Sequence, residues 1–489
     1  MTTAGVRVWG FAATSFAAVI VVYTLGSRDF GFGVDAGWHY AFAEELIRGH
    51  RWPISNETFF SAGMTDYPPA GHLLAVGIGA LVGSTLHGIF IVTGLAFTAI
   101  YLALAEIVKR RDALSTIAIL AVFVLILVIT KKFRAYFGNE VIDEFFFAQL
   151  VGTGALLVAF LIVARLRGGL LVWLLSSASA AHLIAWFYPL SAIQFAFAAT
   201  ALQALQIFDR PWQWWLISVR TLSTVGVLGI VVVIHPAFFG MIKNALNDGG
   251  IVFPIISIFL MIACMLIGIL LLAWLRRSSG FLLTDALMAL ATGICTMALA
   301  QAVAYYALGL GSPYAIKKHG FALGTVGALV AASLIVELPM IRAALERRRV
   351  QWLAGLRVFA GPVFLLLVLA AIFTGRKNVP VDTMVDFDRE LRTFMDSPDA
   401  PPLIGATLLA NAALPAASQN FTVALARLRP APAVLIEQSQ LLIQAPEAPK
   451  AAQFVLVARD PAPEPGCLVG AARSFVVIHV RCFTPIGAR

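Results

Sequence analysis

Charged residues are scarce in this chain. Asp, Glu, Lys and Arg together make up only 12% of its 489 residues, whereas 60% are hydrophobic. A soluble globular protein carries about a quarter charged residues, so that class is excluded. The apolar residues come in repeated runs of about 20, the length at which a helix crosses a bilayer. They do not alternate with polar residues, which disfavours a membrane β-barrel. We therefore predict a polytopic α-helical membrane protein.

Cysteine is also rare, and its pattern indicates no metal site. The chain has four Cys, without a CxxC motif or a Cys/His cluster. Cys264 and Cys295 lie inside apolar runs and are expected to be small core residues. Cys467 and Cys482 lie in a less apolar region near the C-terminus, where they would form a disulfide if that region is extracytoplasmic. No clear small-x-small cleavage site follows the first apolar run, which we interpret as a retained helix.

Apolar length and loop charge place about eleven spans, with the N-terminus inside and the C-terminal tail outside. The number of spans depends on the basic segment Glu106–Asp112, which should face the cytoplasm. It faces the cytoplasm only if the short, Gly-rich stretch Pro68–Val82 is a juxtamembrane or re-entrant helix rather than a span. The expected spans are about Val8–Leu25, Leu86–Val108, Ala113–Thr130, Phe145–Ala164, Leu170–Trp186, Leu190–Ile207, Leu216–Ile234, Ile251–Trp274, Leu282–Leu308, Phe321–Ile341 and Val358–Phe373.

The composition changes at about Gly375, after which the chain is polar and contains Pro. Short apolar stretches, "AVLIE", "QFVLVAR" and "SFVVIHV", then alternate with turn signals and predict strands. We divide the chain into a transmembrane domain, residues 1–375, and a small extracytoplasmic α/β domain, residues 376–489. The net charge of +9 comes mostly from Lys and Arg in short loops between spans. Because the positive-inside rule accounts for that excess, we expect no nucleic-acid partner.

The first outward loop contains the segment "DAGWHYAFAEELIRG", which predicts an amphipathic helix. Trp38, Phe42 and Leu46 share one face, and we expect this face to lie on the membrane surface. Asp35 stands at the helix start, where it serves either as an N-cap or as a functional carboxylate. Glu44 is expected to be solvated.

Four segments carry a resemblance to a known family. In chain order they are "GVDAGWHY", "YPPAGHLL", "FGNEVIDEFF" and "SPYAIKKHG". Together with the alternation of spans and the C-terminal domain, they resemble the GT-C glycosyltransferases, polytopic enzymes that use lipid-phosphate-linked sugars. "GWH" with "YPPA" is also similar to the arabinofuranosyltransferases of mycobacterial cell-wall assembly. The chain lacks the "WWD" signature of oligosaccharyltransferases, which argues against transfer of a preassembled oligosaccharide to Asn.

The resemblance implies roles for particular residues. Asp35 occupies the position of the catalytic base, and Asp143 best fits a second acidic residue, with Glu140 and Glu144 as alternatives. Basic and aromatic side chains of the later outer loops are expected to hold the donor phosphate: Lys317, Lys318, His319, Tyr314 and Arg134. Three further residues are assigned to the acceptor or cavity: His39, Tyr67 and His182. For His182, a hydrogen bond between helices is the competing interpretation.

The implied reaction moves a sugar from a polyprenyl-phosphate donor to a hydroxyl of a glycan or glycolipid. It takes place at the outer face of the bacterial cytoplasmic membrane, and a single displacement inverts the anomeric carbon. No cofactor is required by the pattern, although a divalent metal would also neutralise the phosphate. Two alternatives stay open: a secondary transporter, and a non-catalytic membrane protein whose outer domain binds glycans. Few charges within spans and no inverted repeat count against transport.

Overall fold

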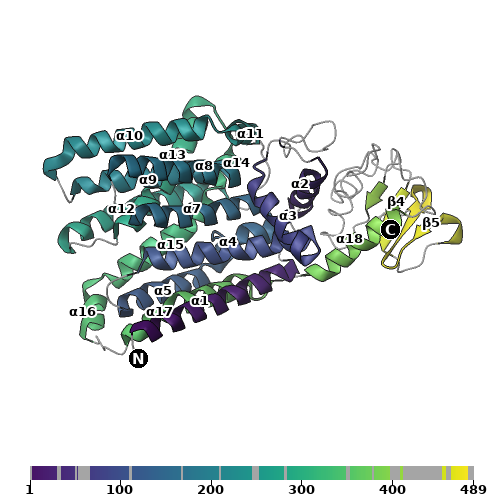
Figure 1. The fold of residues 1–489 in the computed structure, drawn as a ribbon, viewed down its shortest axis with the longest axis horizontal. Helices are drawn as coiled ribbons and strands as arrows, with labels where there is room; N and C mark the ends of the chain where they lie inside the picture. The colour runs from purple at the N-terminus through teal and green to yellow at the C-terminus, as the bar shows by residue number, and fades with distance from the viewer. Residues whose placement is uncertain are drawn as a thin grey trace. The chain divides into compact units, whose positions relative to one another are not determined.

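The computed structural model describes residues 3–29, 35–49, 52, 67–109, 113–166, 169–208, 211–244, 253–279, 284–347, 353–376, 379–396, 408–410, 454–458 and 464–482. The chain divides into two compact units, and Figure 1 labels the helices and strands named below. The first comprises Met1–Leu25, Val92–Glu140 and Ala148–Arg376, and the second Gly26–Ile91, Val141–Phe147 and Lys377–Arg489. The domain boundary after residue 375 stays a prediction.

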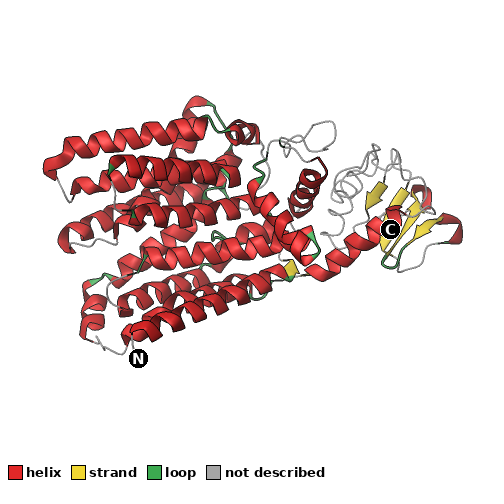
Figure 2. Cartoon of the chain, viewed as in Figure 1, coloured by secondary structure: helices red, strands yellow, loops and turns green. Residues whose placement is uncertain are grey.

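The first unit is built from helices (Figure 2). Within the described residues, ten helices of the chain are long and apolar enough to cross a membrane. The predicted class, a polytopic α-helical membrane protein, is thereby confirmed. The helices of the first unit, including those too short to be counted among the ten, are α1 (Thr3–Gly26), α4 (Thr85–Ile107, which begins in the second unit), α5 (Ala113–Ile129), α7 (Phe147–Arg165), α8 (Leu170–Phe187), α9 (Pro189–Ala204), α10 (Trp214–Val233), α11 (Pro236–Asn244), α12 (Ile255–Ser279), α13 (Thr284–Leu308), α14 (Pro313–Lys317), α15 (Gly320–Val336), α16 (Pro339–Arg347) and α17 (Leu353–Phe373). Short 3₁₀ turns cover Lys131–Phe133, Leu205–Phe208 and Pro211–Gln213.

Three sequence expectations differ from the structure of this unit. The predicted span Ala113–Thr130 is a helix of 17 residues, which is shorter than each of the ten helices that are long enough to cross a membrane. At 1.5 Å per residue it is about 25 Å long, against about 30 Å of hydrocarbon. The predicted span Phe321–Ile341 instead ends at Val336, and a separate helix begins at Pro339, because Pro starts helices readily but does not continue them. Finally, Cys295 is buried as expected, but Cys264 is exposed on α12.

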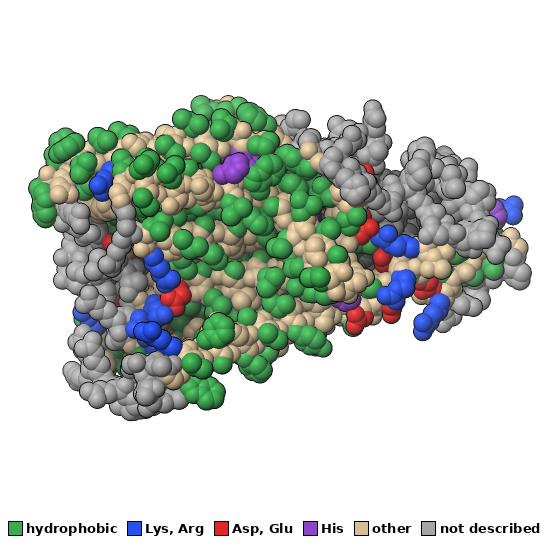
Figure 3. Space-filling view, in the orientation of Figure 1, with side chains coloured by type: hydrophobic (Ala, Val, Ile, Leu, Met, Phe, Trp, Pro, Cys, Tyr) green, Lys and Arg blue, Asp and Glu red, His purple; other side chains and the backbone are tan. Residues whose placement is uncertain are grey.

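Small residues let the helices of the first unit approach closely. α9 packs against α13, and a Cβ added at Gly293 of α13 would lie 2.5 Å from the backbone N of Ala198. A Cβ at Gly324 of α15 would lie 1.9 Å from the carbonyl oxygen of Ala135. Inside a bilayer, lipid is as apolar as Leu, so the hydrophobic effect does not drive helices together. Close van der Waals packing at small residues stabilises their association instead. Outside, apolar side chains cover the helices of this unit (Figure 3), as expected for surfaces that face lipid.

The second unit contains the first outward loop and the C-terminal segment. Its helices are α2 (Asp35–Gly49), α3 (Ala70–Val82) and α18 (Val381–Asp396), and the short helix α6 (Asn139–Asp143) enters it from the first unit. Strands β3 (Leu408–Ala410), β4 (Phe454–Ala458), β6 (Phe475–His479) and β5 (Leu468–Ala471) form a sheet in that order, parallel between β3 and β4 and antiparallel elsewhere. β1 (Arg28–Asp29) pairs with β2 (Val379–Pro380). Short 3₁₀ turns cover Pro465–Cys467 and Val480–Cys482.

Several predictions about this unit can be checked directly. "QFVLVAR" and "SFVVIHV" are strands β4 and β6, whereas "AVLIE" lies outside the described residues. α3 has only 13 residues, consistent with a juxtamembrane helix. Cys467 and Cys482 form a disulfide. α18 packs its aromatic residues Phe387 and Phe394 on Phe475 of β6.

The apolar face of α2 is covered by protein. Phe42 is fully buried and Leu46 is 5% exposed, and α2 packs against α3. The ring of Phe42 contacts that of His72, with centroids 4.8 Å apart. The expectation that this face lies on the membrane surface is therefore wrong. Helix α3, and not lipid, packs against this face.

Candidate functional site: a lysine-bearing cavity

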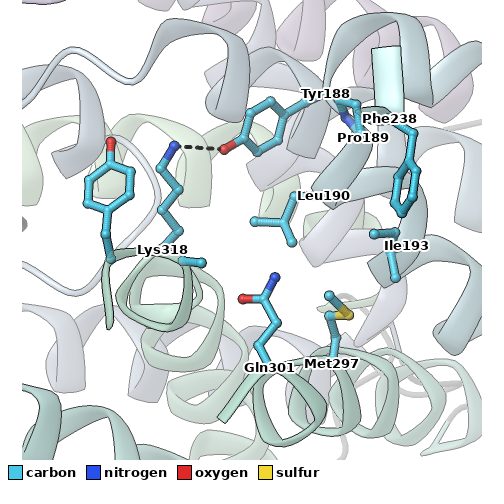
Figure 4. A pocket seen from close by; sticks show the side chains of 10 residues that line it. Tyr188, Pro189, Leu190, Ile193, Phe238, Met297, Gln301 and Lys318 are labelled. Atoms are coloured by element: carbon cyan, nitrogen blue, oxygen red, sulfur yellow. Dashed lines mark hydrogen bonds between the residues drawn. The ribbon is translucent and has the colours of Figure 1, made fainter. Parts of the chain in front are cut away.

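The first unit contains a cavity of about 200 Å³ with apolar walls. It is bounded by residues from α9, α11, α13 and α14 and from the turns next to them. Tyr188, Pro189, Leu190, Ile193, Phe238, Met297, Gln301, Tyr314, Ala315 and Lys318 line it (Figure 4). The polar groups of this lining are the Tyr hydroxyls, one Gln amide and the ammonium of Lys318. Of these, the ammonium alone is charged.

The Lys318 side chain is held by two tyrosines. Its Nζ donates to the hydroxyl of Tyr188 over 3.1 Å and lies 4.5 Å from the ring centroid of Tyr314. Lys318 is only 8% exposed and Tyr188 is fully buried. A cation over an aromatic face gains electrostatic energy without a full hydration shell. The cavity therefore combines apolar walls with a nearly dehydrated positive charge.

Local sequence explains why the backbone presents Lys318 at this point. Ser312 caps α14 by accepting from the backbone N of Ala315 over 3.3 Å, and Pro313 stands at the first helical position, where its missing N–H costs nothing. The helix ends after one turn, and the Gln149 amide donates to the carbonyl of Lys318 over 2.8 Å. Both ends of the turn are thus fixed, which orients the lysine.

His319 follows Lys318 but does not line the cavity. Its Nδ1 lies 2.9 Å from Nε2 of Gln194, and its Nε2 lies 2.9 Å from Oε1 of Gln301. An amide nitrogen only donates and an amide oxygen only accepts. The imidazole is therefore the neutral Nε2–H tautomer with both nitrogens engaged. As a direct phosphate ligand, which the sequence suggested, it would first have to break one of these bonds.

The other predicted donor residues differ in position. Tyr314 lines the cavity, whereas Lys317 and Arg134 are half-buried and are not among its lining residues. Arg134 has a φ of 53°. His182 is exposed on α8, where it accepts from Nε1 of Trp186 over 3.2 Å and its ring lies 4.8 Å from that of His235. His182, which was predicted to line the cavity, is therefore not among the residues that line this one.

Glu140, one of the three acidic candidates, is completely buried in the first unit. Its Oε2 accepts from the backbone N of Gly138 over 2.6 Å, and its Oε1 has no hydrogen-bond partner among the described residues. Burial raises the pKa of this carboxyl to about 8. It is accordingly protonated at neutral pH, and a protonated carboxyl suits a buried structural role better than that of a base. Glu144 is half-buried, and the side chain of Asp143 lies outside the described residues.

Glu140→Gln is expected to remove a pH dependence of stability. A carboxyl whose pKa is higher in the folded state binds more protons than in the unfolded state, so stability falls as pH rises from about 4.5 to about 8. Gln imitates the protonated carboxyl. The melting temperature of the variant in detergent should match that of wild type near pH 5 and exceed it near pH 8. An unchanged pH profile would contradict this assignment.

In the second unit, Asp35 is the first residue of α2, but its side chain lies outside the described residues. His39 follows one turn later. Its Nδ1 lies 2.8 Å from Nε2 of His72, whose Nδ1 donates to the carbonyl of Pro68 over 3.3 Å. Burial lowers the pKa of His72 to about 3, so that ring is neutral. Its Nε2 must then accept, and His39 donates from Nδ1.

An aromatic enclosure surrounds this histidine pair. Tyr67 lies edge-on to the ring of His39, with centroids 5.5 Å apart, and Phe147 lies edge-on to both histidines. His39 and Tyr67, both predicted as acceptor or cavity residues, are thus brought together in a buried cluster. His72 lies within the segment "YPPAGHLL", but no role was predicted for it. A histidine in the first turn of a short apolar helix was the available signal.

An ion cluster joins α2 to α18 within the second unit. Arg392 donates through Nη2 to Glu44 over 3.0 Å and to the hydroxyl of Tyr40 over 2.6 Å, and through Nε to Asp388 over 3.1 Å. Tyr40 also donates to Asp388 over 2.9 Å. The side chain of Glu44 is only 12% exposed. The prediction that Glu44 is solvated is wrong, because a helix almost 350 residues later supplies its cation.

Within the described part of the chain, no group of three or more His, Cys, Asp or Glu side chains is placed to hold a metal ion. Sequence reasoning assigned no role to Tyr188 and Gln301, which line the cavity, or to Gln194, which contacts His319. Gln194 and Gln301 each lie within a span that is mostly apolar, and polar residues within spans are a recognised functional signal.

Comparison with known proteins identifies similar structures but no family. No protein-family model matches the chain, and no curated protein matches it. Crystal structures of ArnT from Cupriavidus metallidurans are similar over almost the whole length. The apo form has 15% identity and a TM-score of 0.45 over 96% of this chain and 98% of that one. The form bound to undecaprenyl phosphate has 16% identity and a TM-score of 0.46 over 98% of each chain. At these identities and scores, we infer no function from the likeness.

Proposed function

We propose that the chain is a GT-C-type glycosyltransferase that moves a sugar from a polyprenyl-phosphate donor to a hydroxyl of a glycan or glycolipid at the outer face of the cytoplasmic membrane. The observation that supports it most is the Lys318 ammonium in an apolar cavity of the membrane unit. The apolar lining suits an isoprenoid chain, and the ammonium with the Tyr188 hydroxyl suits a phosphate. Poor solvation strengthens the attraction between them.

In the proposed reaction, the acceptor oxygen bonds to the anomeric carbon as the bond from that carbon to the phosphate oxygen breaks. The polyprenyl phosphate leaves with the electron pair, and negative charge grows on it. Lys318 stabilises this charge, which is the kind of interaction that lowers a barrier most. The acceptor proton passes to the carboxylate of Asp35, because a hydroxyl is a weak nucleophile until it loses its proton. One displacement of this kind inverts the anomeric carbon.

Lys318→Met is expected to weaken binding of a lipid phosphate by about 10- to 100-fold, the usual worth of a hydrogen bond to a charged group. The probe is farnesyl phosphate, measured by thermophoresis on purified protein in detergent, with farnesol as the uncharged comparison. Lys318→Arg retains the charge and should retain most of the preference for the phosphate. Lys132→Met, which removes an exposed lysine, should leave the binding unchanged.

The same preparations test the reaction. Wild-type protein in liposomes with a polyprenyl-phosphate sugar and a glycolipid acceptor should yield a glycosylated product by mass spectrometry. Absence of any preference for farnesyl phosphate over farnesol would contradict the proposal. Uptake of a substrate into the liposomes without glycosyl transfer would favour a transporter instead.

A further inference from the structure

The cavity wall contains one polar side chain without a role in the reaction described above. Gln301 projects from α13 into the same space as Met297 (Figure 4). The other residues of that wall are apolar or aromatic, so a Gln there needs a reason. Burying an amide without hydrogen bonds is unfavourable, and the group is therefore expected to be matched to partners on both of its ends.

The carbonyl end of Gln301 has a fixed partner. Its Oε1 accepts from Nε2–H of His319 over 2.9 Å, and Nδ1 of His319 accepts from Nε2 of Gln194 over 2.9 Å. His319 is fully buried and Gln194 is 5% exposed. These three side chains come from three segments of the chain and form one relay. Because both ring nitrogens of His319 are engaged, the bond from its Nε2–H to Oε1 holds the Gln301 amide in one orientation.

The relay leaves the NH₂ end of Gln301 available to the cavity. Among the described residues, Nε2 of Gln301 has no hydrogen-bond partner. The Lys318 ammonium, which lines the same cavity, is also a donor only. A ligand oxygen beside these two groups therefore meets two donors, one of them charged, which favours an anionic oxygen over a neutral hydroxyl.

We propose that Gln301 is a ligand-binding residue whose NH₂ group donates to an oxygen of the anionic head group of a lipid phosphate. His319 is its positioning residue: it acts by holding the amide through the bond from Nε2–H to Oε1. This inference rests on the proposed function and assigns His319 a role different from that of a direct phosphate ligand. The preference for phosphate over alcohol thus depends on a relay that begins at Gln194 of α9.

Gln301→Glu is expected to weaken farnesyl phosphate binding by about 10-fold or more, because an acceptor replaces the donor and adds a like charge. Farnesol binding should stay the same. Gln301→Met removes the donor without adding charge and should weaken only the phosphate, by a smaller factor. Val303→Leu, which changes an exposed residue of the same helix outside the cavity lining, is the matched control and should alter neither ligand.

His319 is tested by the same ratio of affinities. His319→Leu should lower the preference for phosphate over alcohol by several fold, whereas His319→Gln, whose NH₂ can replace the Nε2–H donor, should restore it. An equal loss of both ligands in His319→Leu would overturn the positioning role. If the ratio of the affinities for farnesyl phosphate and farnesol is unchanged in both Gln301 variants but is lost in Lys318→Met, this inference is overturned while the proposed function stands. A wild-type protein without any preference would overturn the proposed function and this inference together.

Discussion

Asp35→Asn is expected to lower glycosyl transfer by about 10²–10⁴-fold, the usual contribution of a general base. The amide cannot take the proton of the acceptor hydroxyl. Asn and Asp are equally good at helix N-termini, so the start of α2 at this residue should be preserved. Transfer is measured in liposomes with a polyprenyl-phosphate sugar, and farnesyl phosphate binding reports the cavity separately. Binding should be unchanged while turnover is lost.

Asp386→Asn is the matched control for this experiment. Asp386 is 72% exposed on α18 and pairs with Arg389 one turn away. Its removal should leave transfer within twofold of wild type. If Asp35→Asn turns over as fast as wild type, Asp35 is not the base, and Asp143 and Glu144 become the next acidic residues to replace.

Arg392→Met is expected to destabilise the second unit by about 2–3 kcal/mol, somewhat less than the cost of breaking a fully buried ion pair, because the Arg392 side chain is 34% exposed. The change leaves Glu44 and Asp388 mostly buried without their cation. Burial raises the pKa of Asp388, and Arg392 opposes that rise. Without the arginine, the folded state binds more protons than the unfolded state, so the deficit in melting temperature should grow from pH 5 to pH 8.

Arg389→Met provides the comparison on the same helix. Arg389 and its partner Asp386 are 70% and 72% exposed, and such surface pairs contribute about 0–1 kcal/mol. The melting temperature of this variant should hardly change. Equal stability of the two variants would show that the cluster between α2 and α18 does not hold the second unit together. A double-mutant cycle of Arg392→Met with Glu44→Gln would measure the coupling directly.

Hydropathy along the chain was enough to predict most of the helices and the class of protein. Spans such as α10 and α17 were found within a few residues, since apolar length alone decides whether a segment crosses a bilayer. The strands β4 and β6 also follow from the sequence. For Cys467 and Cys482 the sequence offered a disulfide only on the condition that their region is extracytoplasmic, and the structure shows that they are bonded. Lys318 was singled out because a basic pair in an outward loop departs from the usual distribution of charge.

Which polar side chains meet depends on how the helices pack in three dimensions. Lys317 and Lys318 are adjacent in sequence, yet a helical turn directs only Lys318 into the cavity. Gln194 and Gln301 are separated by more than a hundred residues and are joined by His319. Arg392 reaches Glu44 across most of the chain. Periodicity reports which face of a helix is apolar but not which helix covers it, and the hydrogen bonds of a buried polar group depend on that neighbour.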